Sequence, residues 1–455
     1  MFTRIWPLAT HSTPSPFETT VTTNSAKITM GLTSKLEKLK FKSTGGNEVA
    51  NSTIADEDTS DIDEVDEGGH SILMGIIAQL RPGMDLTKIT LPTFILEKKS
   101  MLERITNAFY TPEILLEANL TDDPLGRFLL VVKWYLSCWH IAPKAVKKPL
   151  NPILGEFFTC YWDNLPEGEK AYYIAEQTSH HPPKSSYFYI IPNLKIKVDG
   201  IIVPKSRFLG TSVASMMEGW AHVTLGEREN EVYILNQPNV YCRGILFGTM
   251  KMELGDHMYV RCPKTGYEAD IEFKTKGFIS GTYDAIEGTV KKLGSSEVLY
   301  TITGKWNDVM SIKDHKTGEK TVFYDTNHAT IKKPKVRKLN EQLDNESRKL
   351  WQPTVEGLKK RNHEIATTEK LKVENRQRED AKTRAEEGID FHPKFFTVSA
   401  NPTSPDGEHL EYHIYKPFDL SNTSEELTDE ILDIAPILPG QEFHEKFQIP
   451  AFKKT

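Results

Sequence analysis

The residues best suited to chemistry are two adjacent histidines, His180 and His181, which two prolines follow at once. A strand-like run from Tyr172 precedes them and a second begins at Tyr187, so the pair lies where a predicted strand ends. Pro182 removes a backbone donor and favours an extended conformation at His181. Two imidazoles on stiff backbone, beside hydroxyl groups, could bind a phosphate. The residues alone are equally compatible with a polar strand end.

A second group of charged residues lies on a predicted helix from about Thr367 to Glu387. Lys370, Glu374 and Arg378 follow each other at intervals of four residues, which places them on one face of that helix. From the spacing alone, we interpret this stripe as a solvent-exposed, salt-bridged face.

Two other chemistries fit the residues less well. A hydrolase would need Ser179 as its nucleophile with a histidine as base, but no Gly-x-Ser-x-Gly elbow surrounds it. Adjacent residues on an extended strand also face opposite ways. The run from Cys138 to His140 offers one cysteine and one histidine, too few ligands for a metal. We therefore predict no catalytic residue, no metal site and no cofactor.

Composition limits the class of protein. The chain has 455 residues and a formal net charge of -7, which argues against nucleic acid as a partner. Four scattered cysteines without a Cys-x-x-Cys pair argue against a disulfide framework and favour a reducing cytosol. No apolar run approaches the roughly 18–20 residues of a membrane span, so membrane contact is expected to be peripheral. Residues 1–68, with an acidic run from Asp56 to Glu67, are predicted to be disordered.

Beyond the tail, the pattern changes from helix to strand and back. Residues 100–142 have helical spacing, and alternation from Asn151 to Asp325 predicts many short strands, with Asp199-Gly200 as a two-residue hairpin turn. Many strands at short spacing imply a large antiparallel sheet or barrel, which at this size can enclose a ligand cavity. Helix returns from Glu341 to His363, with an interruption at Pro353. A short apolar helix from Ser71 to Leu80 precedes all of these elements.

Several of these strings resemble the oxysterol-binding protein family of lipid transfer proteins. The run from Glu176 to Pro183 is similar to the family's Glu-Gln-x-Ser-His-His-Pro-Pro fingerprint, and Lys148 to Glu156 resembles its second motif. The stripe on the later helix resembles the family's third phosphate-binding element. Leu80 to Glu97 and the C-terminal tail from Phe391 to Gly440 are most similar to the phosphatidylserine-handling branch. We expect a short, fungal-type member that consists of the lipid-binding domain alone.

The resemblance implies an α+β fold: a large, near-complete antiparallel β-barrel with a central lipid tunnel, an N-terminal lid and flanking helices. The domain would span 69–455, with the lid at about 69–98, the barrel at about 148–325 and a C-terminal helical part at about 340–455. A free two-chain phospholipid exposes roughly thirty methylenes at ~0.8 kcal/mol each, so a closed tunnel removes most of the barrier to leaving a membrane.

The resemblance also implies two exchangeable ligands, phosphatidylserine and phosphatidylinositol 4-phosphate, which would be collected from anionic membranes. The residues carried over for the phosphoinositide are Lys148, Asn151, His180, His181, Lys370, Glu374 and Arg378. Those carried over for phosphatidylserine are Leu91, Thr93, Ile95, Asn151 and Ser206. The implied location is cytoplasmic and peripheral, at contact sites between endoplasmic reticulum and plasma membrane.

Two alternatives remain open. The motifs are shared by carriers of sterol, so a protein that exchanges sterol for the phosphoinositide has the same fingerprint. A lipid-regulated sensor or scaffold would bind lipid tightly and transfer little of it.

Overall fold

The computed structural model describes residues 80–85, 92–141, 146–245, 250–277, 281–399 and 410–443. The predicted tail, its acidic run, the apolar helix up to residue 79 and Leu91 lie outside the described residues.

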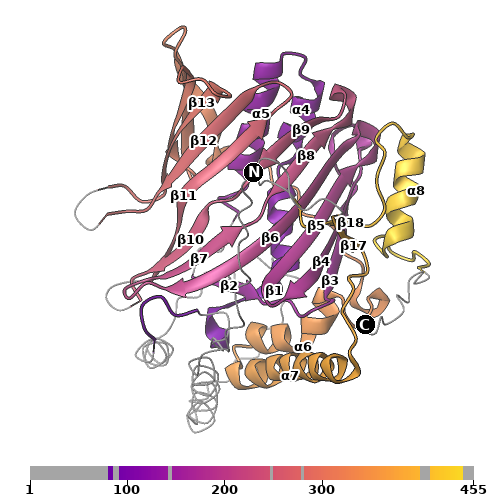
Figure 1. Ribbon diagram of the computed structural model, residues 1–455. Helices are drawn as coiled ribbons and strands as arrows, with labels where there is room; N and C mark the ends of the chain where they lie inside the picture. Colours follow the sequence, from indigo (N-terminus) through magenta and orange to yellow (C-terminus); the bar gives the residue numbers. More distant parts are fainter. Residues whose placement is uncertain are drawn as a thin grey trace, which may run out of the picture.

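One large antiparallel sheet of 14 strands dominates the molecule (Figure 1). Its main path runs from β16 through β15, β14, β13, β12, β11, β10, β7, β6, β5 and β4 to β3, and β8 and β9 bridge β6 to β11. The strands are β3 (Phe157–Trp162), β4 (Ala171–His180), β5 (Pro183–Ile191), β6 (Ile196–Phe208), β7 (Val213–Glu218), β8 (Ala221–Leu225), β9 (Glu231–Leu235), β10 (Asn239–Arg243), β11 (Lys251–Cys262), β12 (Tyr267–Lys274), β13 (Ala285–Lys292), β14 (Val298–Lys305), β15 (Val309–Asp314) and β16 (Lys320–Asp325). The predicted large antiparallel sheet is confirmed.

The register of β6 defines two ends of this sheet. Ile196, its first residue, lies opposite Leu225, beside the β8–β9 turn, and its last residue, Phe208, lies opposite Val213. The β4–β5 turn, residues 180–183, lies toward the end where β6 finishes. We call this the histidine end and the other the α4–α5 end.

The prediction of a hairpin turn at Asp199-Gly200 is wrong. β6 passes through both residues without a break, and Gly200 pairs with Tyr187 on one side and Ala221 on the other. A Cβ at Gly200 would lie 2.1 Å from Cζ of Tyr187. The glycine therefore makes room for a tyrosine ring, and the chain reverses earlier, at Lys195, whose φ is 51°.

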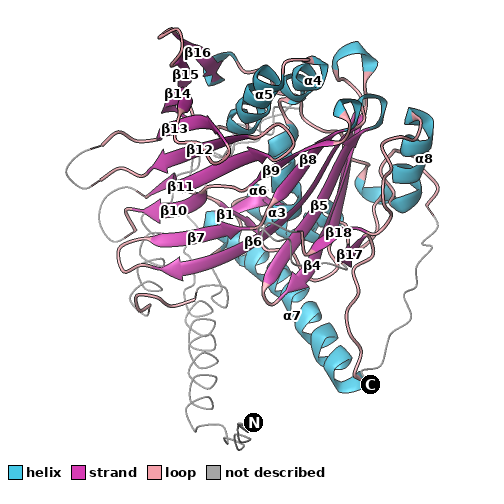
Figure 2. Ribbon diagram, turned by 45° about the horizontal axis from the view of Figure 1, so that its top comes forward, coloured by secondary structure: helices cyan, strands magenta, loops and turns pink. Residues whose placement is uncertain are grey.

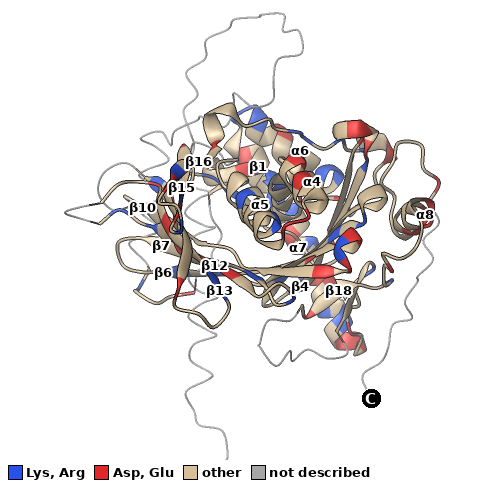
Figure 3. Cartoon of the chain, turned by 90° about the horizontal axis from the view of Figure 1, so that it is seen from above, with Lys and Arg blue, Asp and Glu red and all other residues tan. Residues whose placement is uncertain are grey.

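Alternate side chains of the sheet enter two different apolar cores, as a period of two requires. On β4, Tyr173 and Ala175 join the large inner core, whereas Tyr172 and Ile174 join a second core on the outer face. The sheet bends into a partial ring around the inner core, which α4 (Pro112–Leu120) and α5 (Pro124–Ser137) fill (Figure 3). These helices follow α3 (Met101–Arg104) and the short turn η3 (Ile105–Phe109).

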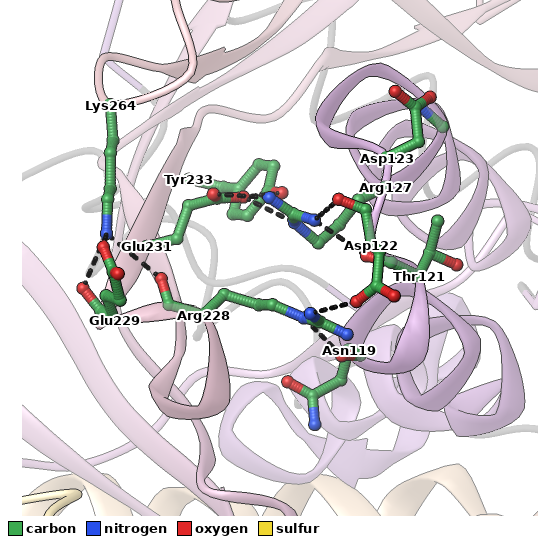
Figure 4. A network of polar contacts seen from close by, with 11 residues as sticks. Asn119, Thr121, Asp122, Asp123, Arg127, Arg228, Glu229, Glu231, Tyr233 and Lys264 are labelled. Atoms are coloured by element: carbon green, nitrogen blue, oxygen red, sulfur yellow. Dashed lines mark hydrogen bonds and ion pairs between the residues drawn. The ribbon is translucent and has the colours of Figure 1, made fainter.

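A network of charged side chains fixes α4 and α5 to the sheet (Figure 4). Arg127 donates from Nε and Nη2 to the two oxygens of Glu231, at 2.9 and 2.8 Å, and both residues are buried. Arg228, from the β8–β9 turn, donates to the Asn119 carbonyl at 2.8 Å and pairs with Asp122 at 2.6 Å. The helices are thus held at the end of the sheet opposite the histidine pair.

The chain after β16 returns to the free edge of β3. Tyr161 and Lys335 exchange two backbone hydrogen bonds, of 3.0 and 2.7 Å, and Glu346 forms a parallel bridge with Phe157. Arg337, which is buried, donates to Glu346 and to the Pro436 carbonyl. The segment that joins strands to C-terminal helices therefore covers one edge of the sheet.

The remaining elements lie outside the sheet. The hairpin β17 (Phe396–Val398) and β18 (Tyr412–Ile414) and helix α8 (Ser424–Ile434) cover the outer faces of β4 and β5 (Figure 2). A parallel pair, β1 (Leu96–Ser100) and β2 (Lys148–Leu150), packs on α6 (Ser347–Lys359), beside α7 (His363–Glu387). Six short 3-10 helices complete the elements of the described residues: η2 (Thr93–Ile95), η4 (Pro166–Gly168), η5 (Pro192–Leu194), η6 (Gly226–Arg228), η7 (Thr326–His328) and η8 (Leu339–Glu341).

The predicted interruption at Pro353 does not occur. α6 continues through this proline and ends six residues later, at Lys359. Leu350 and Trp351, just before it, are buried in a core with β1 and β2, and this packing outweighs the lost backbone hydrogen bond. α7 begins at His363, four residues before the predicted start, because Asn362 caps it by accepting from the Ile365 N–H.

Candidate functional site

The histidine pair occupies the end of β4 and the turn into β5. His180 is the last residue of β4 and is half-buried, and His181 is exposed. Their ring centroids are 4.5 Å apart. Ser179 donates from Oγ to the Pro182 carbonyl at 2.7 Å, which closes the turn. Both imidazoles are therefore held on a short, internally bonded loop, as the prolines predict.

The predicted stripe on α7 is a chain of ion pairs. Lys370, which is buried, donates to Oε1 of Glu374 at 2.5 Å, and Arg378 lies 3.5 Å from Oε2 of the same carboxylate. The interpretation of this face as simply solvent-exposed is thus wrong for Lys370, because the helix lies against the loop that follows β2. Gln377 accepts there from the Leu154 N–H at 3.3 Å.

The histidine pair and the stripe meet. Burial and the neighbouring His181 lower the pKa of His180 to about 4, while the Pro152 carbonyl and Glu374 act to raise it and Arg378 to lower it. The ring is therefore neutral near pH 7. Its Nδ1 is buried and has no hydrogen-bond partner among the described residues. A ligand that supplies the missing hydrogen bond to this buried atom would bind more favourably for that reason.

Lys148 extends the same cluster. Burial lowers the pKa of its ammonium group, and the nearby Lys370 cation lowers it further. Asn151 follows β2 and is exposed, next to the Pro152 carbonyl that faces His180. The structure thus brings all seven predicted phosphoinositide residues to one place, from the end of β2, the β4–β5 turn and α7. An anion there would offset the repulsion between two close ammonium groups.

Two buried carboxylates support this cluster, and the sequence reasoning gave neither of them a role. Glu156 accepts from the side chains of Ser100, Ser347 and Trp351 and from the Ile153 N–H, over 2.5–3.1 Å. It thereby fixes the loop after β2 to β1 and α6. Its glutamate identity within an otherwise apolar run was the one available signal.

The second carboxylate is Glu176, on β4. Its two oxygens accept from the N–H groups of Lys394 and Phe395 at 2.7 and 2.8 Å, which attaches the start of the C-terminal layer to the sheet. Gln177, next along the strand, accepts from Ser185 Oγ at 2.6 Å and donates to the Ser179 carbonyl at 2.8 Å. The predicted fingerprint is thus mainly a scaffold for the histidine pair.

The predicted phosphatidylserine residues are more dispersed. Thr93 is buried, and its hydroxyl lies 3.4 Å from Nδ1 of His363 and 3.4 Å from the Thr367 hydroxyl, both at the start of α7. Ile95 is half-buried in the same short turn. Ser206, on β6, is half-buried two residues from Phe208, whose cluster also contacts Phe94. Thr93 and Ser206 therefore both border the histidine end, on different elements.

The arrangement suits binding better than catalysis. Ser179 directs its hydroxyl to a backbone carbonyl and not to a histidine. Among the described residues, no group of three or more His, Cys, Asp and Glu side chains could hold a metal ion. The cluster offers three cations, one carboxylate and two imidazoles, a set that fits a phosphate with hydroxyl neighbours.

Comparison with known proteins identifies the family. The model of the oxysterol-binding protein family matches residues 75–359. The chain belongs to the oxysterol-binding protein family. It is 66% identical over 430 residues to oxysterol-binding protein-like protein OBPa of Candida albicans, across 93% of this chain and 99% of that one. It is 56% identical to oxysterol-binding protein homolog 6 of Saccharomyces cerevisiae, across 94% and 96% of the two chains.

Solved structures of this family share the fold. The Osh1 ORD domain in complex with cholesterol superposes with a TM-score of 0.63 at 22% identity, over 86% of this chain and 94% of that domain. The Osh3 ORD of Saccharomyces cerevisiae in complex with PI(4)P gives 0.57 at 20% identity, over 79% and 92%. The expected family and fold are therefore confirmed, and the chain is a lipid-binding protein of this family. Within the described residues, no helix has the length and apolar character to cross a membrane.

Proposed function

We propose that this protein exchanges phosphatidylserine for phosphatidylinositol 4-phosphate between two membranes. The observation that carries the proposal is the convergence of His180, His181 and the α7 cations around the half-buried His180 ring. Membership of a lipid-binding family supplies the class of ligand, and a protein of the same fold binds PI(4)P.

In this proposal the phosphomonoester of the phosphoinositide lies between the histidine pair and α7. Lys148, Lys370 and Arg378 supply charge, and the two imidazoles supply directional hydrogen bonds. Glu374, which already holds Lys370 and Arg378, orients these cations and can accept from an inositol hydroxyl. Asn151 offers an amide at the rim of the cluster.

Phosphatidylserine is proposed as the second ligand because the segment from Leu80 to Glu97 resembles that branch of the family. Thr93, Asn151 and Ser206 are its proposed polar contacts, with Leu91 and Ile95 beside the acyl chains. Both headgroups would use Asn151, so the two lipids would exclude one another. Opposed gradients of the two lipids then drive net transport, and each tenfold gradient supplies about 1.4 kcal/mol. Contact sites between endoplasmic reticulum and plasma membrane are the proposed place.

Replacement of His180 and His181 by Ala tests the phosphate site. The double variant is expected to extract no phosphatidylinositol 4-phosphate from liposomes, because the unpaired imidazole and its neighbour are lost. Uptake of phosphatidylserine, which needs neither side chain, should remain and serves as the control for folding. Extraction and uptake are measured with fluorescent lipid sensors after the protein is separated from the liposomes.

Either of two results would contradict the proposal. Unchanged phosphoinositide extraction by the folded double variant would show that the histidine pair does not bind the phosphate. Efficient uptake of sterol by the wild type, with negligible uptake of phosphatidylserine, would assign the protein to the sterol alternative.

A further inference from the structure

The neutral ring of His180 has one hydrogen to donate, and a backbone carbonyl accepts it. The ring hydrogen-bonds to the Pro152 carbonyl, whereas its Nδ1 is buried with no hydrogen-bond partner among the described residues. The N–H that faces the carbonyl therefore belongs to the other ring nitrogen. Since a neutral imidazole has a single N–H, Nδ1 presents a lone pair.

A phosphate cannot form a hydrogen bond with this lone pair. The oxygens of an ionised phosphate are acceptors, so Nδ1 can bond to one only after it gains a proton. Transfer of the existing N–H from one ring nitrogen to the other would satisfy the phosphate, but it would leave the Pro152 carbonyl without its donor. A second proton satisfies both acceptors, because an imidazolium donates from both nitrogens.

The charges around the ring oppose a second proton until a phosphate binds. His181 lies beside the ring in the same turn, with centroids 4.5 Å apart, and α7 presents Glu374 and Arg378 to it. Lys370, which pairs with Glu374, and Lys148 complete the cluster. Three cations and one carboxylate give a charge of +2 (3 − 1). A phosphomonoester of about −2 cancels this charge and removes the opposition.

We propose that binding of the phosphoinositide transfers a proton from solvent to Nδ1 of His180, and that the resulting imidazolium donates to the Pro152 carbonyl and to the lipid phosphate together. This inference rests on the proposed function, in which the phosphomonoester lies between the histidine pair and α7. Uptake of phosphatidylserine needs neither histidine in that proposal. Exchange of one lipid for the other therefore moves one proton, and the balance between the two loaded forms depends on pH.

The direction of this pH dependence follows from the number of protons. The loaded protein holds one proton more than the empty protein, so the contribution of His180 to phosphoinositide affinity rises as the pH falls. The pKa of the empty ring is about 4, and a nearby opposite charge raises the pKa of an imidazole by about one to three. The gain in affinity is therefore confined to the range from about pH 7 down to about pH 4, and it is at most about tenfold per pH unit.

Isothermal titration calorimetry with short-chain phosphatidylinositol 4-phosphate counts the protons. At about pH 5.5, in buffers of different ionisation enthalpy, wild type should take up about half to one proton more per lipid than H180N. The comparison removes the protons that the lipid phosphate itself exchanges, because both proteins bind the same lipid. H315N is the matched control: it removes an exposed imidazole that bonds to Thr301 on β14, and it should behave as wild type does. Equal proton uptake by wild type and H180N would overturn the proposal.

A second measurement decides the matter if H180N binds the lipid too weakly for calorimetry. Nitrogen NMR of wild type with isotope-labelled histidines distinguishes an imidazolium from a neutral ring, because two protonated ring nitrogens resonate close together. The His180 signals, assigned by their loss in H180N, should change from a neutral ring to an imidazolium when the lipid is added at the same pH. A ring that stays neutral in the loaded protein would overturn this inference alone. Failure of wild type to bind the phosphoinositide at all would overturn the proposed function and this inference with it.

Discussion

At the scale of single residues, the sequence predicted the candidate phosphate-binding side chains but not the carboxylates that support them. His180 and His181 are adjacent, and the two prolines after them predict a stiff turn, so both could be selected from the sequence. The supporting roles of Glu156 and Glu176 could not be predicted, because a buried carboxylate is recognised by its partners; a glutamate in an apolar run was the one signal, and only for Glu156. Those partners, Ser347 and Lys394 among them, lie 191 and 218 residues away along the chain.

Glu176 gives a prediction about pH. Burial raises the pKa of this carboxyl from 4.5 to about 7, against the opposing effect of the Lys394 and Phe395 N–H groups. The folded protein therefore holds a proton that the unfolded chain releases between these two values. The stabilisation from Glu176 is complete below about pH 4.5 and is lost as the pH rises through about 7, by up to about 3 kcal/mol.

Urea unfolding of wild type and Glu176→Gln over this range is the measurement. The variant keeps a neutral side chain at every pH, so the difference in unfolding free energy between the two proteins should change with pH only inside that window. Glu379→Gln, an exposed glutamate on α7, should reproduce the wild-type slope. A constant difference between wild type and Glu176→Gln would mean that this carboxyl does not titrate there.

At the scale of elements, the helical and strand periods predicted most of the segments, and the errors have local physical causes. Asp199-Gly200 has the composition of a turn, but the glycine is needed beneath the Tyr187 ring. Pro353 is a helix breaker, but packing of Trp351 keeps α6 intact around it. The hairpin of β17 and β18 went unpredicted because its strands have three residues each. In each case a tertiary contact outweighed a local preference.

The crossing of α6 and α7 makes an element-scale prediction. A Cβ at Gly357 would lie 2.7 Å from the Ala366 nitrogen and 2.9 Å from its Cα, so even alanine must push the helices apart. Gly357→Ala should lower stability by about 1–3 kcal/mol. It should also weaken phosphoinositide binding, because α7 carries Lys370, Glu374 and Arg378. Glu356→Ala, on the exposed face of α6, should affect neither quantity.

Thermal unfolding and a binding titration with phosphatidylinositol 4-phosphate measure the two effects. A loss of stability with wild-type affinity would show that the position of α7 does not determine how tightly the phosphoinositide binds. A gain in stability, as expected from the helix propensity of alanine alone, would mean that the helices accommodate the methyl group.

At the scale of the whole molecule, the large antiparallel sheet followed from the sequence, but the contacts that cover its edge and fill its ring did not. The sheet edge at β3 is covered by a segment that starts beyond β16, through Tyr161 and Lys335. α4 and α5 fill the ring through packing in the inner apolar core, and a buried ion pair between Arg127 and Glu231 joins α5 to β9. Periodicity is local and contains no information on such pairings. The two ends of the sheet consequently differ: helices are fixed by buried contacts at the α4–α5 end, and the candidate binding cluster lies at the histidine end.

This division predicts how the ion pair of Arg127 and Glu231 behaves. Arg127→Met should cost about 3–5 kcal/mol of stability, because it leaves a buried carboxylate whose remaining side-chain donor is Tyr233. The double variant R127M/E231Q removes the unpaired charge and should recover part of that loss in urea unfolding. Because the pair lies far from His180, both folded variants should bind phosphatidylinositol 4-phosphate with wild-type affinity. A double variant less stable than Arg127→Met would show that the carboxylate is not the source of the loss, and weakened binding would show that the two ends are coupled.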